Sequence, residues 1–163
     1  MTRRLLGFCV GLALCLQPGY TSGGRLPPNV LLVVVDDLNT DIGAYGHGQV
    51  QTPNIDRLAD RGVLFTRAYT QYPQCNQSRA SFLTSQYPDQ LQVLSLKEHV
   101  RDNQPDVVTL PQHFRNNGYF TARVGKIFHQ GVPPEIGLDG LDDAAYWDLA
   151  INPAGVVIEV DEM

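Results

Sequence analysis

The sequence predicts an α/β fold, in which a mixed and mainly parallel sheet is flanked by helices. Residues 29–35 form a continuous apolar, β-branched run, which is typical of a parallel strand covered on both faces. A helical pattern follows at residues 52–59, and a second apolar stretch follows at residues 63–69. Such alternation of strand and helix signals indicates the α/β class.

Each predicted helix carries a boundary signal. Thr52 suits the N-cap of the first helix, and Pro53 suits its first turn. A second helix begins just after Cys75 and ends before the break at residues 86–88. A third helix at residues 109–118 ends on a glycine, which readily adopts the left-handed conformation of a helix C-terminus.

The last part of the chain has weaker signals. Residues 119–124 are the third predicted strand, and residues 156–160 are suited to one more. Between them the prolines, the glycines and an acidic group predict a surface loop beyond Gly131. The acidic group consists of Asp139, Asp142 and Asp143.

The first residues have the pattern of a signal peptide, which we place at residues 1–22. Arg3 and Arg4 precede an apolar run at residues 5–16, and small residues follow it. That run is shorter than the roughly 20 residues that cross a bilayer, so we expect no transmembrane anchor. The mature chain, residues 23–163, is expected to be exported to the periplasm, the cell surface, the medium or a lysosome-like compartment.

Removal of the signal peptide makes the chain more acidic and leaves one cysteine. Two arginines and no acids are lost, so the formal charge changes from −5 to −7, which argues against a nucleic-acid partner. Cys75 remains without an internal disulfide partner. It is an inert buried residue, half of an intermolecular bridge or a reactive group.

Three short constellations have residue types suited to chemistry. Asp36 and Asp37 end the first predicted strand, where a divalent cation would offset the repulsion between their carboxylates. The alternative is that one aspartate caps a turn and the other is solvated. Cys75 and Arg79 open a helix, where a thiolate or a bound anion is favoured; the alternative is a buried thiol beside a solvated arginine. From spacing alone, the two interpretations of the aspartate pair are about even, whereas the buried thiol is slightly favoured over the reactive one.

The third constellation is Lys126 and His129, which follow the strand at residues 119–124. If this stretch is helical, both side chains lie on one face, where lysine can hold an anionic oxygen and histidine can transfer a proton. Taken singly, a lysine and a histidine are more often ordinary surface groups.

Together, these patterns resemble the type I sulfatases of the alkaline phosphatase superfamily. The resemblance covers residues 29–131, and within the family this sequence is most similar to the iduronate-2-sulfatase branch. It implies that this chain is the N-terminal part of the sulfatase sheet, with residues 23–163 forming an incomplete domain. The matching segments, in chain order, are residues 29–37, Thr52 to Ala59, Cys75-x-x-Ser78-Arg79, Phe82 to Thr84, and Gly118-Tyr119 leading to Gly125-Lys126-x-x-His129.

The resemblance implies roles for individual residues. Asp36 and Asp37 would bind one calcium ion together with Cys75. A formylglycine-generating enzyme would convert Cys75 to formylglycine, whose hydrated aldehyde attacks the sulfate ester. Arg79 would steady the formylglycine and the metal end of the site. Lys126 would hold the sulfate, and His129 would assist proton transfer.

Three departures from the family pattern bear on activity. Gln77 stands where the family usually has proline, which puts maturation of Cys75 in doubt, and Ser85 replaces a common glycine. The further Asp-His or Asp-Asn metal ligands of the family do not occur before Met163. The chain as given should therefore bind calcium weakly and turn over little substrate.

The predicted function is that of a sulfuric ester hydrolase acting on a sulfated sugar or polysaccharide, represented here by a truncated chain. Two alternatives remain open. One is an exported remnant of the fold that has lost catalysis, which Gln77 and the short length favour. The other is a related phosphate or phosphonate esterase with an unmodified nucleophile.

Overall fold

The computed structural model describes residues 26–154. The predicted signal peptide at residues 1–22 and the predicted strand at residues 156–160 therefore lie outside the described residues. Among the described residues, no helix is long and apolar enough to cross a membrane.

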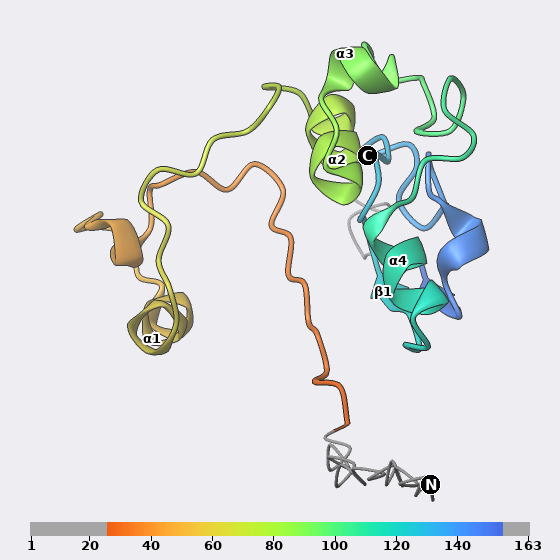
Figure 1. The fold of residues 1–163 in the computed structure, drawn as a ribbon. Helices are drawn as coiled ribbons and strands as arrows, with labels where there is room; N and C mark the ends of the chain where they lie inside the picture. The colour runs from red at the N-terminus through yellow and green to blue at the C-terminus, as the bar shows by residue number, and fades with distance from the viewer. Residues whose placement is uncertain (1–25, 155–163) are drawn as a thin grey trace, which may run out of the picture. The chain divides into compact units, whose positions relative to one another are not determined.

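The chain divides into two units, residues 1–33 and residues 34–163. The described part of the first unit contains no helix or strand. Every helix and strand described below belongs to the second unit, whose elements are drawn in Figure 1. The α/β class is confirmed there, because helices accompany a small parallel sheet.

Helix α1 spans Pro53–Arg61, as its proline and capping signals predicted. Thr52 precedes it but does not cap its backbone. The Thr52 hydroxyl instead donates to Oδ1 of Asp56 at 2.9 Å and accepts from the backbone N–H of Gly43 at 2.9 Å. Since Gly43 begins the short 3₁₀ helix η1 (Gly43–Tyr45), Thr52 joins η1 to α1.

Helix α2 spans Cys75–Thr84 and is the second confirmed helix prediction. It ends at Ser85, whose φ of 60° is left-handed. A residue with a Cβ loses about 1 kcal/mol in that conformation, so glycine at this position would be better suited to the helix end. The one-turn helix α3 (Pro88–Leu91) follows directly.

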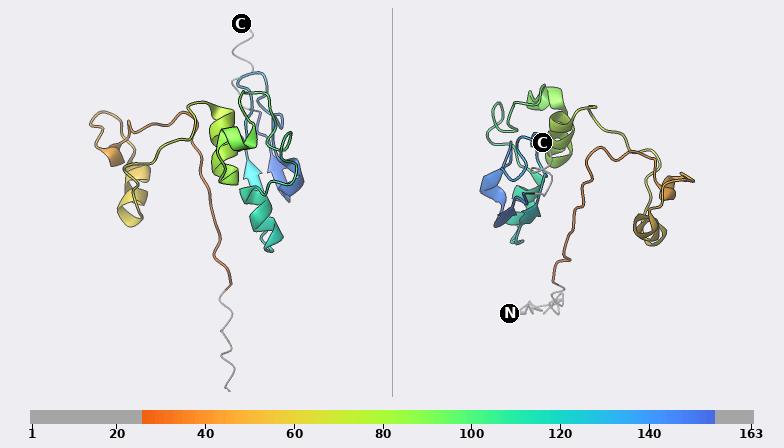
Figure 2. Two further views of the ribbon diagram at one scale, coloured as in Figure 1. Left: turned by 45° about the horizontal axis from the view of Figure 1, so that its top comes forward. Right: turned by 180° about the vertical axis from the view of Figure 1, so that it is seen from behind.

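Helix α4 (Leu110–Asn116) leads into the sheet. Gly118 follows α4 with a φ of +81°, as predicted, and the chain then enters β1 (Ala122–Val124), which is shorter than expected. The left view of Figure 2 shows the β1 arrow directly after α4. Strand β1 pairs in parallel with β2 (Leu149–Ile151), in a register that places Arg123 opposite Ala150.

One apolar cluster holds α2, the segment after α3 and the segment after β1 together. Phe128 is 4% exposed in this cluster, and Ile127 packs against it. Burial of these side chains fixes the backbone next to Lys126, which is how the core positions a candidate site residue. The buried members are Ala80, Leu83, Leu91, Val93, Val100, Val107 and Phe128.

Two strand predictions were wrong in the described structure. Residues 29–35 and 63–69 are not assigned to any strand, and their large side chains are exposed, with Leu31 at 88% and Phe65 at 70%. An apolar, β-branched run indicates that a segment is suited to burial. A strand also needs a neighbouring backbone that pairs with its N–H and C=O groups, and the described sheet does not pair with either segment.

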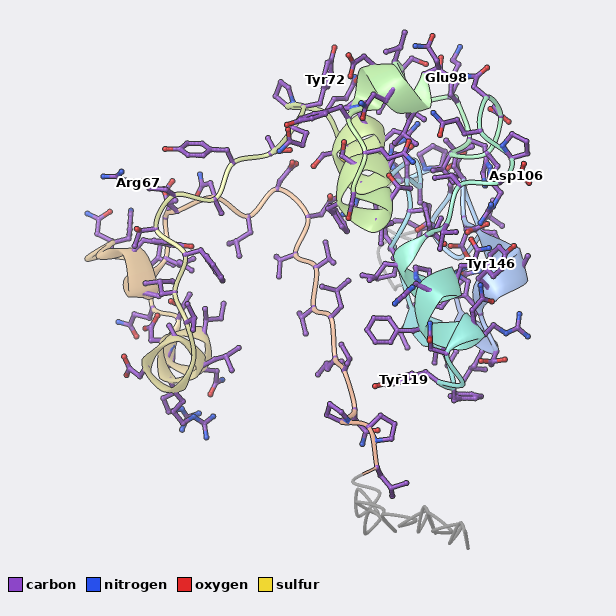
Figure 3. The ribbon with its side chains drawn as sticks, in the orientation of Figure 1. Arg67, Tyr72, Glu98, Asp106, Tyr119 and Tyr146 are labelled. Carbon is purple, nitrogen blue, oxygen red and sulfur yellow. The ribbon has the colours of Figure 1, made fainter. Side chains whose placement is uncertain are left out.

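The predicted surface loop beyond Gly131 was also partly wrong. Asp143 is 3% exposed and accepts from Nε of Arg101 at 2.8 Å, while Oδ2 of Asp142 accepts from Nε of Arg123 at 2.5 Å. Acidic composition indicated exposure, but arginines from earlier segments pair with both carboxylates. The short helix η2 (Ala144–Tyr146) follows, and its Tyr146, labelled in Figure 3, lies 4.7 Å from the Arg101 guanidinium.

Candidate functional site

Four of the predicted site residues meet in one place within the second unit. They are far apart in the sequence: the hydrogen bonds that join them span up to 90 residues. One comes from the extended segment before η1, two from the first turns of α2, and one from the loop after β1. We call this group the Asp36 cluster; its members are Asp36, Cys75, Arg79 and Lys126.

Asp36 is the centre of the cluster, because a different cation binds each of its oxygens. Nζ of Lys126 donates to Oδ2 at 2.7 Å, and a terminal nitrogen of Arg79 donates to Oδ1 at 2.7 Å. The hydrogen bond from Lys126, followed by that from Arg79, holds the pKa of Asp36 far below its usual range, against the opposing effect of burial. Asp36 is therefore a carboxylate at neutral pH.

Cys75 is the first residue of α2, and its half-buried thiol lies between the two kinds of charge. Sγ donates to Oδ1 of Asp36 at 3.5 Å and lies 3.7 Å from Nζ of Lys126. A group attached to the Cys75 sulfur would therefore lie next to both a carboxylate and an ammonium.

Arg79 lies one turn after Cys75, so the two side chains share a face of α2. The residue is only 4% exposed, and besides Asp36 it donates to the backbone carbonyl of Ile127 at 2.8 Å. Arg79 thus connects the start of α2 with both the aspartate and the segment that carries Lys126.

Lys126 reaches Asp36 because the chain turns sharply at the end of β1. Gly125 has a φ of +72°, which glycine adopts freely, and its N–H donates to the carbonyl of Ile151 in β2 at 2.9 Å. Residues 125–130 form no helix, so the idea that Lys126 and His129 share a helix face is wrong.

His129 differs from the cluster in its contacts. Its Nδ1 is buried and has no hydrogen-bond partner among the described residues. Burial lowers the pKa of His129, and the positive charge of Lys126 lowers it further. The imidazole is therefore neutral at pH 7, as a proton acceptor requires, but no hydrogen bond joins it to the Asp36 cluster in the described structure.

Asp37 lies beside a cavity of about 350 Å³, which is also lined by Asp36, Cys75 and Arg79. Its carboxylate and that of Asp36 are the hard oxygen donors that calcium prefers, so they fit such an ion in kind. They do not fit it in number, because the described residues include no group of three or more potential metal ligands. The described residues are thus suited to part of a calcium site.

One neighbour of Cys75, Asn76, was not predicted to matter, whereas Gln77 was singled out only for its departure from the family pattern. Asn76 donates through Nδ2 to the backbone carbonyls of Ser95 at 2.9 Å and Glu98 at 2.8 Å, which fixes the start of α2. No local signal predicts these partners, because they lie about twenty residues further along the chain. Gln77 is fully buried, and its Oε1 has no partner among the described residues.

Comparison with known proteins gives the class to which this chain belongs. The sulfatase family model matches residues 28–142, which include every residue of the Asp36 cluster. This chain therefore belongs to the sulfatase family.

Individual relatives agree with this assignment. The chain is 43% identical over 129 residues to an iduronate 2-sulfatase of Mus musculus and 41% identical over 128 residues to that of Homo sapiens. It is also 40% identical over 128 residues to an arylsulfatase A of Bos taurus. These matches cover 76–78% of this chain but only 23–25% of each relative.

Proposed function

We propose that this chain provides the nucleophile end of a sulfatase that hydrolyses the sulfate esters of a sugar or polysaccharide. The observation that carries the proposal is the convergence of Asp36, Cys75, Arg79 and Lys126 from three separate segments. Sulfate-ester cleavage gathers negative charge on oxygen atoms, and two fixed cations beside a nucleophile suit that chemistry. Relatives named for sugar sulfates, the iduronate 2-sulfatases, support the substrate class.

The nucleophile in this proposal is formylglycine, formed from Cys75 by a formylglycine-generating enzyme before or during export. A formylglycine at position 75 would supply a hydrated aldehyde, with one hydroxyl to displace the alcohol of the ester from sulfur and a second hydroxyl from which the aldehyde reforms as sulfate leaves. Lys126 lies 3.7 Å from the Cys75 sulfur and is suited to hold a sulfate oxygen there. Arg79, fixed by the Ile127 carbonyl, holds Asp36 in place beside it.

His129 is the proposed proton-transfer group. A neutral imidazole accepts a proton at neutral pH, and the lowered pKa of His129 keeps it in that form. Its buried Nδ1 without a described partner is consistent with a role in which hydrogen bonds form only once substrate is bound.

Calcium is the proposed cofactor, with Asp36, Asp37 and the modified Cys75 as part of its ligand set. When bound, such an ion stabilises negative charge on an ester oxygen. Calcium takes about six to eight oxygen ligands, so we propose that the others come from outside the residues described here. That the chain is the front portion of a longer sulfatase stays a prediction, which the reading frame downstream of Met163 tests.

The direct test of this proposal is the chemical state of Cys75. The full chain is produced together with a formylglycine-generating enzyme, and the tryptic peptide that ends at Arg79 is analysed by mass spectrometry and with an aldehyde-reactive probe. We expect an aldehyde at Cys75, and none in Cys75→Ala. A Gln77→Pro variant serves as a matched comparison, because it restores the residue usual in the family.

Hydrolysis of an aryl sulfate is the second readout, and Cys75→Ala should lower it by about 10³-fold or more. Sulfatase activity that survives Cys75→Ala contradicts the assigned nucleophile. Hydrolysis of phosphate esters by an unmodified thiol favours the phosphoesterase alternative. A folded chain that keeps its thiol and hydrolyses neither ester is the inactive remnant.

A further inference from the structure

Arg123 contacts the turn that carries Lys126. Its side chain lies on β1 and is only 2% exposed. Nη1 donates to the carbonyl of Gly125 at 3.2 Å and to Oδ1 of Asn152 at 2.5 Å, so one nitrogen joins the end of β1 to the residue after β2. The rest of the guanidinium binds Asp142 at 2.5 Å and Asp139 at 3.0 Å, which holds it in one position.

The turn at Gly125 depends on such contacts. Its φ is +72°, and glycine adopts positive and negative φ about equally readily, so the backbone by itself does not hold this conformation. In the described structure both polar groups of Gly125 are bound: its N–H donates to the carbonyl of Ile151 at 2.9 Å, and its carbonyl accepts from Arg123. These two hydrogen bonds set the direction in which the chain leaves β1.

The other side of the turn is held by Arg79. Nη1 of Arg79 donates to the carbonyls of Ile127 at 2.8 Å and Lys126 at 3.4 Å. Lys126 therefore lies on a short stretch of backbone between two buried arginines, one acting at Gly125 and the other at Ile127. From this stretch its Nζ lies 3.7 Å from the sulfur of Cys75. A lysine has a long and flexible stem, so a fixed backbone is needed to keep its ammonium in one place.

We propose that Arg123 is a positioning residue for the candidate site: by holding the carbonyl of Gly125, it keeps the Lys126 ammonium beside the group at position 75. In the described structure Arg123 has no hydrogen bond to the Asp36 cluster, so it acts through the turn. This inference rests on the proposed function, because that function makes Lys126 the group that holds sulfate.

The test measures how close the Lys126 amine lies to the Cys75 thiol. The probe is o-phthalaldehyde, which joins a thiol and a primary amine that lie side by side into one fluorescent isoindole. The full chain is produced without a formylglycine-generating enzyme, so that Cys75 keeps its thiol. We expect the wild-type chain to become fluorescent, and we expect no fluorescence from Lys126→Gln or Cys75→Ala.

Arg123→Lys is the test variant, because it keeps a positive charge for Asp142 but lacks the planar fork that also reaches Gly125. We expect its isoindole to form about fivefold or more slowly than in wild type, since the rate of such a reaction depends on how the two groups are oriented. Combined with Lys126→Gln, this variant should give no fluorescence, which excludes a reaction of the amine introduced at position 123.

A second variant covers the case in which Arg123→Lys fails to fold. Arg123→Met combined with Asp142→Asn removes the guanidinium together with the charge that it would leave unpaired. It should lower the rate of isoindole formation by the same factor or more. Circular dichroism shows which of the variants are folded.

Arg101→Lys is the matched control. Arg101 also pairs with a buried aspartate, Asp143, at 2.8 Å. Its other hydrogen bonds in the described structure go to Gln112 and to the carbonyls of Pro105 and Val107, which all lie outside the turn. Arg101→Lys should therefore form the isoindole at the wild-type rate.

Three results overturn the inference: a wild-type chain that forms no isoindole between Lys126 and Cys75, a folded Arg123 variant that reacts as fast as wild type, or an equal loss of rate in folded Arg101→Lys. None of these measurements requires an aldehyde at Cys75 or turnover. Failure of the positioning role is therefore separable from failure of the proposed hydrolase function.

Discussion

Two regions of this molecule contain arginine–aspartate ion pairs of almost the same length, but the pairs have different roles in the two regions. In the Asp36 cluster, Arg79 lies 2.7 Å from Asp36. In the region around η2, Arg101 lies 2.8 Å from Asp143, and Arg123 lies 2.5 Å from Asp142. We call the second region the loop network; it consists of Arg101, Arg123, Asp142 and Asp143.

The difference lies in charge balance and exposure. Each carboxylate of the loop network has one arginine and a side chain that is 3% exposed, and neutral donors fill its remaining positions. Asp36 has two cations, a side chain that is 42% exposed, and a cavity beside it. A buried pair whose hydrogen bonds are all satisfied holds a loop in place, whereas a partly exposed carboxylate at a cavity lies, with its two cations, where a ligand can reach it.

The largest expected effect comes from breaking the loop network at Asp142. Asp142→Ala leaves the Arg123 side chain, which is 2% exposed, without its buried partner, and also removes the acceptor of Nε1 of Trp147 at 3.0 Å. We expect the free energy of unfolding, measured by urea denaturation, to fall by about 3–5 kcal/mol.

Asp139→Ala is the matched control, because Asp139 binds the same guanidinium at 3.0 Å but its side chain is 65% exposed. Its loss should stay below about 1 kcal/mol. Equal losses in the two variants would show that burial does not distinguish these ion pairs.

Asp36→Asn should have a smaller effect on stability, although Asp36 accepts from two cations. Its exposure to solvent weakens both interactions, so we expect the free energy of unfolding to fall by about 1 kcal/mol. Asp37→Asn, at the exposed neighbouring carboxylate, is the control and should change little. A loss in Asp36→Asn as large as that in Asp142→Ala would make Asp36 a structural residue like those of the loop network.

The same two regions show what the sequence can predict. The residues of the Asp36 cluster were all candidates in the sequence, because each stands next to a local signal and the family resemblance then grouped them. The signals are an apolar run that ends before Asp36, a helix start at Cys75 and a strand end before Lys126. What local signals do not contain is their geometry. That Asp36 would bind both Arg79 and Lys126 depends on contacts across 43 and 90 residues.

The loop network was missed for the complementary reason. Acidic residues among prolines and glycines indicate a solvated loop, and only the tertiary fold brings Arg101 to Asp143 across 42 residues. Strand β2 was missed as well, since its three residues carry little periodicity. Of the elements, the helices were predicted best, because capping residues, prolines and terminal glycines act within a few residues of the helix ends.

The smallest expected effect is a change with pH in the free energy of unfolding, and it concerns His129. Unlike the aspartates compared above, His129 has no charged partner among the described residues. Burial and the charge of Lys126 lower the pKa of His129 in the folded chain below its ordinary 6.5. The unfolded chain therefore binds the proton more readily, so the stability is full above about pH 6.5 and is lost as the pH falls toward the folded pKa. Urea denaturation across this range should show a decline in wild type that His129→Gln lacks. His113→Gln, at an exposed histidine of α4, should keep the wild-type decline. If the decline persists in His129→Gln, another titrating group causes it.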